Sequence, residues 1–272
     1  MKKVFLHIGF PKTGTTSIQN FLTLNKLYLQ NLGFSLPVNS LWPHENNILI
    51  AELFRNSDLF TSDLNVLTSD YFNRFPNVSE ITSYLNSEKK KLSLYLSKLC
   101  TDYLIISCEN LVFLKENELI LLRNYLLKYF DTIEIIVYLR DQLSLKHSLL
   151  MTEIINGYSS NLLTPEFLIH DFPNHIRNVP DGYTLHKWDI DEFDYLHCLN
   201  KLEAVFPNSV TPRLFNKKDF INENIFSDFC SVLGINLSSD FIIPNNKNSR
   251  ISFSAAKIIN TFNKSFPGFK DG

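Results

Sequence analysis

The segment VFLHIGFPKTGTTSIQNFL, residues 4–22, decides the fold because it joins a strand to a helix through a loop with two glycines. Its first part, residues 4–10, is a nearly continuous apolar run, as is typical of a strand buried on both faces of a sheet. Apolar residues then recur at helical spacing over residues 17–33, and Gly33 is suited to end that helix. The segment therefore predicts a strand, a tight loop and a helix in immediate succession.

The same order of elements recurs further along the chain. Residues 102–109 and 133–141 are two more apolar strands. A helical pattern follows each of them, at 116–130 and 143–157. Strands of this kind that alternate with helices indicate a mainly parallel sheet with helices on both sides. We therefore expect a three-layer α/β protein, formed by residues 1–272 as a single domain. Less regular segments predict further elements at residues 34–44, 45–55, 79–100, 191–206, 210–215, 222–234 and 252–265.

The overall composition fits a globular protein and excludes several classes of partner. The chain of 272 residues has 26 Lys and Arg against 28 Asp and Glu, so its formal net charge is −2. This balance gives no broad positive field that would attract nucleic acid or an anionic membrane. A hydrophobic content of 44% is enough for a substantial core. Since no signal peptide and no run of about 18 uncharged apolar residues occurs, we expect a cytoplasmic protein without a transmembrane helix.

The four cysteines follow no pattern of a metal site or a disulfide framework. Cys100, Cys108, Cys198 and Cys230 form no CxxC pair and no cluster with histidines. In a reducing compartment such cysteines are most often buried thiols. We therefore expect all four to be buried, and we expect no bound metal.

The loop after the first strand has the features of an anion-binding site. Gly9 and Gly14 stand five positions apart, which lets the chain turn tightly and brings successive backbone N–H groups together. The start of the following helix adds its partial positive charge. The spacing is that of the P-loop, GxxxxGK followed by Ser or Thr, except that Thr15 takes the usual lysine position and the lysine is Lys12. A purely structural turn would account for the glycines but not for Lys-Thr-Gly-Thr-Thr between a strand and a helix.

The residues HIGFPKTGTTSIQNFL, from His7 to Leu22, resemble the 5′-phosphosulfate-binding loop of sulfotransferases that use 3′-phosphoadenosine-5′-phosphosulfate (PAPS). In that family the loop lysine also precedes the second glycine, and the resemblance implies a three-layer fold like that of P-loop NTPases. It implies PAPS as the co-substrate without a metal, and a contact from Lys12 to the region that bridges phosphate and sulfuryl group. The residues that would bind the 5′-phosphate are Thr13, Gly14, Thr15, Thr16 and Ser17.

A second anion site is indicated where the strand at residues 133–141 ends. Arg140 stands at this end, and Ser148 follows eight residues later on the predicted helix. The planar guanidinium of arginine donates in pairs to phosphate oxygens, and a serine two turns into the helix can reach the same anion. The segment YLRDQLSLKHSLL resembles a bacterial branch of the sulfotransferases, which implies that Arg140 and Ser148 bind the 3′-phosphate of PAPS. By itself, an Arg-Asp pair at a strand end is more often a structural salt bridge.

Glu109 is the candidate general base. It is the last residue of the predicted strand 102–109, at the carboxyl edge where sites of parallel sheets usually lie. The strand end Ser-Cys-Glu-Asn-Leu resembles that of bacterial and carbohydrate sulfotransferases, and the resemblance implies that Glu109 and Lys12 are catalytic. The alternative role for Glu109 is a carboxylate that caps the next helix. His44 is a weaker candidate for the base, whereas His7 is expected in the core.

The C-terminal third adds no catalytic candidate. Residues 205–220 and 246–263 resemble, in fold more than in chemistry, the final third of the same family. The residues there that we expect to be structural or exposed are Arg213, Asn248 and Arg250.

These features favour a PAPS-dependent sulfotransferase that acts on a carbohydrate or another hydroxyl or amine acceptor. Two alternatives stay open, a P-loop nucleoside triphosphate kinase or hydrolase and a non-catalytic nucleotide-binding protein. The displaced Lys12 argues against the first alternative. The intact set of anion contacts argues against the second.

Overall fold

The computed structural model describes five stretches of the chain: residues 1–37, 48–55, 78–155, 194–245 and 252–265. The chain divides into two compact units, Met1–Leu139 with Trp188–Pro244 and Arg140–Lys187 with Asn245–Gly272. The first unit contains the whole described sheet. The expectation of a single domain over the full chain stays a prediction.

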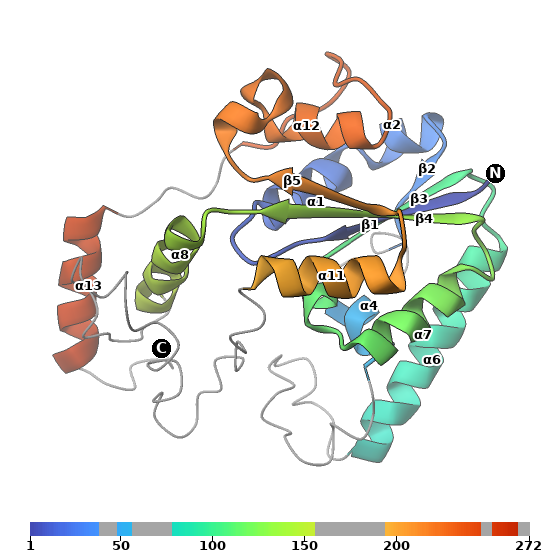
Figure 1. Cartoon of the computed structure of the whole chain (residues 1–272), viewed down its shortest axis with the longest axis horizontal. Helices are drawn as coiled ribbons and strands as arrows, with labels where there is room; N and C mark the ends of the chain where they lie inside the picture. Colours follow the sequence, from blue (N-terminus) through green and yellow to red (C-terminus); the bar gives the residue numbers. More distant parts are fainter. Residues whose placement is uncertain (38–47, 56–77, 156–193, 246–251, 266–272) are drawn as a thin grey trace. The chain divides into compact units, whose positions relative to one another are not determined.

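The first unit is built on a sheet of five parallel strands in the order β2-β3-β1-β4-β5 (Figure 1). The strands are β1 (Lys3–Ile8), β2 (Phe34–Ser35), β3 (Tyr103–Cys108), β4 (Thr132–Leu139) and β5 (Val210–Leu214). The central strand β1 pairs with β3 and β4, and the register places His7 beside Ser107 and Ile136. The carboxyl ends of all five strands therefore meet at one edge. This confirms the α/β class and the parallel sheet predicted from the sequence.

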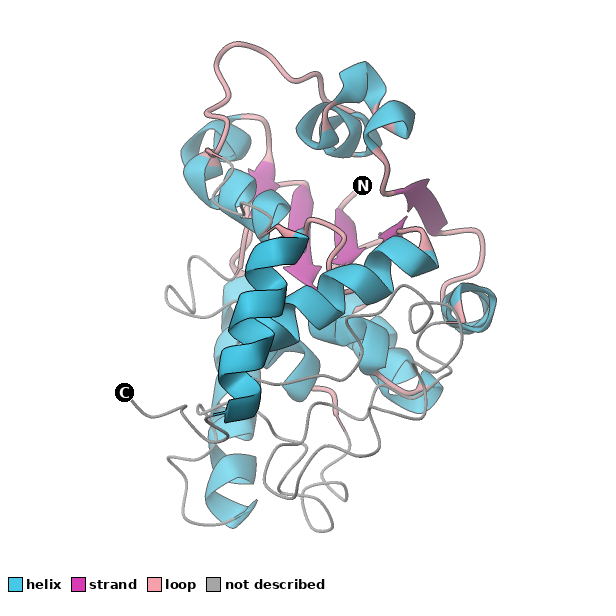
Figure 2. Ribbon diagram, turned by 90° about the vertical axis from the view of Figure 1, so that its left-hand side faces the viewer, coloured by secondary structure: helices cyan, strands magenta, loops and turns pink. Residues whose placement is uncertain are grey.

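Helices cover both faces of this sheet (Figure 2). One face carries α1 (Thr15–Leu24), α2 (Lys26–Asn31) and α12 (Ile225–Val232). The other face carries α4 (Ile48–Glu52), α6 (Val78–Ser97), α7 (Glu116–Leu126) and α11 (Tyr195–Val205). In the described stretches, the connections also contain the 3-10 helices η3 (Glu109–Phe113), η6 (Lys217–Asp219) and η7 (Ile221–Glu223). Among the helices in the described stretches, none is long and apolar enough to cross a membrane.

The alternation of side chains along β1 divides the core into two layers. Val4, Leu6 and Ile8 belong to the cluster that includes α4, α6, α7 and α11. Phe5 and His7 face the opposite layer, where the His7 ring contacts an aromatic ring of α12. All five side chains are buried, which explains the continuous apolar pattern of the strand. The expectation that His7 is a core residue is confirmed.

The helix predicted over residues 17–33 is two helices, because Asn25 interrupts it. The side-chain amide of Asn25 donates to the carbonyl oxygens of Phe21 and Ile242, each at 2.8 Å, and its Oδ1 accepts from Ile242 N at 2.7 Å. The backbone of Asn25 is held at φ −103° and ψ 14°, outside helical geometry. Gly33 then follows the end of α2 with φ +87°, as expected for a glycine in that position.

Three of the four cysteines are buried, whereas Cys100 is exposed. The expectation that all four are buried was therefore wrong for Cys100. Its position explains the difference, because Cys100 lies in the connection between α6 and β3, and connections run over protein surfaces.

The described part of the second unit consists of α8 (Gln142–Ile155) and α13 (Phe253–Ser265). The two helices pack through Met151, Ile154 and Ala256, and Asn263 Nδ2 donates to Ile154 O at 2.9 Å. Both helices confirm elements that the sequence predicts.

Candidate active site

The loop between β1 and α1 presents backbone N–H groups at the carboxyl edge of the sheet. Gly14 is the N-cap of α1 with φ +80°, and no side chain caps the helix. The first intrahelical bond runs from Ile18 N to Gly14 O at 3.0 Å, so the amides of Thr15, Thr16 and Ser17 have no carbonyl of a preceding turn to bond. Lys12 also has a positive φ, 62°. Unbonded amides at a helix start, with the partial positive charge of the helix, form a site suited to an anion.

Both glycines of the loop are required by close packing. A Cβ at Gly9 would lie 2.1 Å from Thr15 Oγ1, so any side chain there would displace Thr15. A Cβ at Gly14 would lie 2.7 Å from the Phe215 ring and 2.8 Å from Ile225 Cδ1, in addition to the strain of a positive φ. The loop therefore keeps its shape by direct contact with the start of α1 and with the chain that follows β5.

The hydroxyl groups of the loop have different environments. Thr13 is buried, and its Oγ1 donates to Phe10 O at 2.5 Å, so its proton is used within the loop. Thr15 is also buried, but its Oγ1 has no hydrogen-bond partner within the described part of the chain. Thr16 is exposed and Ser17 is half-buried. A buried hydroxyl without a partner is costly unless something else bonds to it, so Thr15 Oγ1 is a candidate contact for a ligand.

Glu109 lies beside this loop. The strand β3 ends at Cys108, so Glu109 begins η3 instead of ending the strand as the sequence suggested. Burial raises the pKa of the Glu109 carboxyl, while the nearby Thr15 hydroxyl and the Lys12 ammonium act in the opposite direction. Thr15 Oγ1 is near this carboxyl without the geometry of a hydrogen bond. The structure thus brings the two predicted catalytic residues together with one hydroxyl of the loop.

Glu109 does not cap a helix in the structure. The N-cap of η3 is Cys108, and the N-cap of α7 is Lys115. The carboxylate that caps α7 is that of Glu118, whose Oε2 accepts from Lys115 N at 2.8 Å. Glu109 is therefore a half-buried carboxylate at the edge of the sheet without a capping function.

Arg140 and Ser148 belong to the second unit. Arg140 directly follows β4, and Ser148 lies half-buried in α8. Asp141 is the residue that caps α8, since its Oδ1 accepts from Ser144 N at 2.8 Å. The assignment of Arg140 and Ser148 to a 3′-phosphate stays a prediction.

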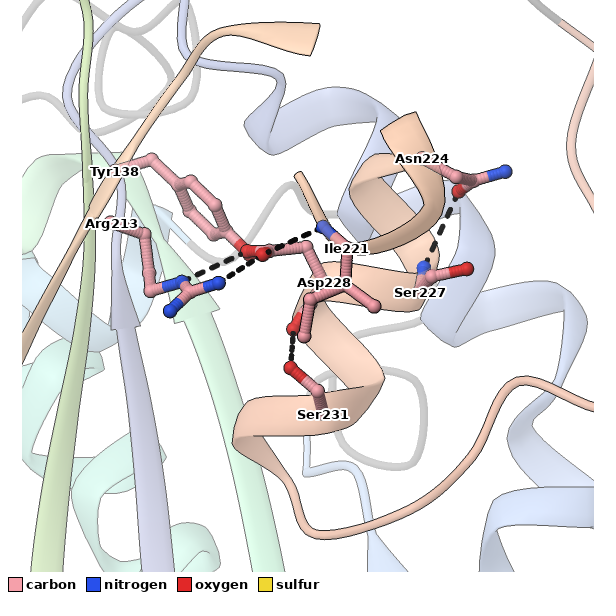
Figure 3. A network of polar contacts seen from close by, with 7 residues as sticks. All are labelled: Tyr138, Arg213, Ile221, Asn224, Ser227, Asp228 and Ser231. Atoms are coloured by element: carbon pink, nitrogen blue, oxygen red, sulfur yellow. Dashed lines mark hydrogen bonds and ion pairs between the residues drawn. The ribbon is translucent and has the colours of Figure 1, made fainter. Parts of the chain in front are cut away.

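A second cluster of charged and polar groups surrounds Asp228, which the sequence did not single out (Figure 3). Asp228 Oδ2 accepts from the Tyr138 hydroxyl at 2.8 Å and from Arg213 Nε at 3.1 Å. Its Oδ1 accepts from Arg213 Nη2 and, at 3.3 Å, from Ile221 N. Burial and the adjacent carboxylate raise the pKa of Tyr138. The structural role expected for Arg213 is confirmed, and no short-range pattern could have revealed its partner in α12.

His7 is not a competing base. His7 Nδ1 lies 2.8 Å from Ser107 Oγ, and the ring packs edge-on against Tyr138 and Phe229. Burial lowers the pKa of His7 to about 3, so the ring is neutral and enclosed. The further candidates His44, Asn248 and Arg250 lie outside the described residues. Within those residues, no three side chains of His, Cys, Asp or Glu are grouped as a metal site.

Comparison with known proteins shows a likeness in fold. No family model matches the sequence, and no curated protein matches it. A sulfotransferase from Alicyclobacillus acidocaldarius is similar in structure, with a TM-score of 0.50 and 13% identity over 97% of this chain and 94% of that chain. A sulfotransferase domain from the curacin biosynthetic pathway has a TM-score of 0.45 and 12% identity, over 94% of this chain and 83% of its own. The α/β architecture, with helices on both faces of a parallel sheet, is thus that of the first of these proteins.

Proposed function

We propose that this protein is a sulfotransferase that moves the sulfuryl group of PAPS to a hydroxyl or amine acceptor. The observation that carries the proposal is the proximity of Lys12, Thr15 and Glu109 at the start of α1, where backbone amides also lack helical partners. The likeness in fold to a bacterial sulfotransferase supports it. The carboxyl edge of a parallel sheet is also where such folds usually bind nucleotides.

The reaction assigns a separate task to each side of the site. An acceptor oxygen or nitrogen attacks sulfur, and the bond between sulfur and the bridging oxygen of the 5′-phosphate breaks, which releases 3′-phosphoadenosine-5′-phosphate. The loop residues Thr13 to Ser17 hold the 5′-phosphate, and Lys12 neutralises the charge that grows on the leaving oxygen. Glu109 accepts the proton of the acceptor. Arg140 and Ser148 bind the 3′-phosphate.

The environment of Glu109 fits a general base. A carboxylate with a raised pKa holds a proton better than an ordinary one, and it still ionises once the pH exceeds that pKa. The neighbouring Lys12 limits the rise, because a cation stabilises the ionised carboxylate. Glu109 can therefore accept a proton when the pH is above its own pKa.

The remaining features of the proposal come from the sequence. A carbohydrate acceptor is proposed from the resemblance of the strand end at Glu109, and a cytoplasmic location is proposed with it. The near-neutral charge favours neither nucleic acid nor a membrane as a partner. No metal takes part in the proposed step. A kinase or hydrolase of the P-loop type would need an ammonium where Thr15 has a buried hydroxyl.

Calorimetry separates these functions. We expect the protein to bind 3′-phosphoadenosine-5′-phosphate in preference to magnesium ATP. We expect Arg140→Ala to lower the affinity for 3′-phosphoadenosine-5′-phosphate. Transfer of labelled sulfuryl groups from PAPS to a panel of mono- and oligosaccharides, with water as the baseline acceptor, then identifies the acceptor class. Preferential binding of magnesium ATP that Arg140→Ala leaves unchanged would overturn the proposal.

A further inference from the structure

Helix α11 holds the backbone that follows Glu109. Lys201, in the middle of this helix, donates from Nζ to Val112 O at 3.1 Å and to Leu114 O at 3.0 Å. These two carbonyl groups lie at the end of η3, the turn that begins with Glu109. The Lys201 ammonium thus links α11 to the segment that begins with the proposed base, although the two are far apart in the sequence.

The contact is suited to this position because a 3-10 helix ends with carbonyl groups that lack a helical donor. In η3, Leu111 O accepts from Leu114 N at 3.3 Å, while the carbonyls of Val112 and Leu114 receive the bonds from Lys201. A cation at the carboxyl end of a helical turn also interacts favourably with its dipole. The side chains of Leu111, Val112 and Leu114 are buried, so this turn is anchored both by its core contacts and by Lys201.

The same helix contacts the phosphate loop. The ring of Tyr195, in the first turn of α11, packs edge-on against Phe10 with ring centroids 4.9 Å apart. Phe10 O is the acceptor for the Thr13 hydroxyl, in the residue next to Lys12. Tyr195 and Lys201 are six residues apart, which is about 9 Å along a helix. A single helix therefore supports the loop at one point and the turn that begins with Glu109 at another.

We propose that α11 sets the position of Glu109 relative to Lys12, with Lys201 as the positioning residue for the base. The inference rests on the proposed function, because it assigns Glu109 to proton transfer. The groups that shift the pKa of Glu109 are Thr15 and Lys12 together with burial. Lys201 acts instead through the backbone, and small displacements of a catalytic group are known to slow reactions strongly.

The test replaces Lys201 by methionine, which keeps the apolar stem and removes the donor. In Lys201→Met we expect faster amide hydrogen exchange over residues 109–114 and a turnover about tenfold lower with the best acceptor of the panel. Affinity for 3′-phosphoadenosine-5′-phosphate should stay within about twofold. Since a loosened turn exposes Glu109 and lowers its pKa, the acidic limb of the rate profile should move to lower pH. Lys201→Arg, which retains donors, should restore most of the turnover.

The control is Lys2→Met. Lys2 Nζ also donates to a main-chain carbonyl, Leu99 O at 2.8 Å, at the amino edge of the sheet. This variant should leave the exchange over residues 109–114 and the turnover unchanged.

If Lys201→Met does not fold, Lys201→Gln, which keeps one donor group without the charge, takes its place.

Unchanged exchange over residues 109–114 in Lys201→Met would overturn the inference. Faster exchange with an unchanged turnover and pH profile would overturn it as well, because the contact would then be purely structural. A wild-type protein that does not bind 3′-phosphoadenosine-5′-phosphate would instead refute the proposed function.

Discussion

Two carboxylates of this protein, the buried Asp228 and the half-buried Glu109, differ in their surroundings. Asp228 receives hydrogen bonds from Tyr138, from Arg213 and from the amide of Ile221, and the guanidinium balances its charge. Burial raises the pKa of Glu109, and the hydroxyl of its neighbour Thr15 has no hydrogen-bond partner within the described residues.

We interpret this difference as one between a structural cluster and the proposed ligand site. Natural proteins satisfy nearly all their buried polar groups, so the Asp228 network is what structural stability requires. Groups that are desolvated and only partly satisfied are instead concentrated at functional sites. Both clusters contain a carboxylate and a cation, and they differ in the buried Thr15 hydroxyl, which has no hydrogen-bond partner among the described residues. Residue type alone therefore does not identify an active site.

The largest effect is expected when the hydrogen-bond network around Asp228 is broken. Asp228→Asn removes the charge that pairs with Arg213, and we expect it to lower the free energy of unfolding by about 3 kcal/mol. For a chain of this size the melting temperature should fall by roughly 10 °C. Thermal unfolding followed by circular dichroism measures this. Lys217→Ala, which removes the exposed pair between Lys217 and Glu223, is the control and should leave the melting temperature nearly unchanged.

Substitutions in the cluster of Lys12, Thr15 and Glu109 should lower turnover without changing stability. Glu109→Gln and Lys12→Ala are each expected to lower turnover about 10²-fold or more, because they remove the base and the charge at the leaving group. Sulfuryl transfer from PAPS measures the loss, and thermal unfolding should be little changed. Glu116→Gln, at an exposed position of α7, serves as the control. Full activity of Glu109→Gln at neutral pH would remove Glu109 from the mechanism.

The two buried threonines of the loop offer a sharper test of the comparison. Thr15→Val replaces a hydroxyl without a hydrogen-bond partner among the described residues by a methyl group of similar size, and we expect the unliganded protein to lose less stability than it does in Thr13→Val. Thr13→Val removes the bond to Phe10 O, and we expect a loss of about 1 kcal/mol. Denaturant unfolding compares them. Binding of 3′-phosphoadenosine-5′-phosphate should be weaker in Thr15→Val, and equal destabilisation by both changes would contradict this account.

The smallest expected effect is a shift in pH dependence. Turnover should fall as the pH drops through the raised pKa of Glu109, because the protonated carboxyl cannot accept a proton. The Thr15 hydroxyl lowers this pKa, so Thr15→Val should move the acidic limb to higher pH. Rates measured between about pH 4 and pH 8, which covers the acidic limb of the profile, test the direction. A limb that moves to lower pH would show that Thr15 does not stabilise the ionised form.

Much of the fold could be predicted because its signals are local. The apolar runs at 4–10, 102–109 and 133–141 lie on three neighbouring strands, and each needs only its own residues to be recognised. The break at Asn25 was missed because it depends on bonds to Ile242, more than two hundred positions away. Helical spacing alone could not reveal that contact.

Local signals also indicated part of the candidate site. The spacing of Gly9 and Gly14 indicated the loop, and the end of β3 indicated Glu109. The proximity of Glu109 to Thr15, the support from Lys201 and the whole Asp228 network required the folded chain, since each joins elements far apart in the sequence. Sequence patterns therefore indicated the candidate residues but not the contacts that hold them in place.

The central place of β1 in the sheet has a consequence for how the chain folds during synthesis. β1 leaves the ribosome first, yet its partners begin only at Tyr103 and Thr132. At the usual rates of translation, an apolar strand is then without its neighbours for a time on the order of ten seconds. Long-range parallel pairing is also slow to form. The phosphate loop, although synthesised early, therefore gains its contacts with Phe215 and Ile225 only after all five strands have been synthesised.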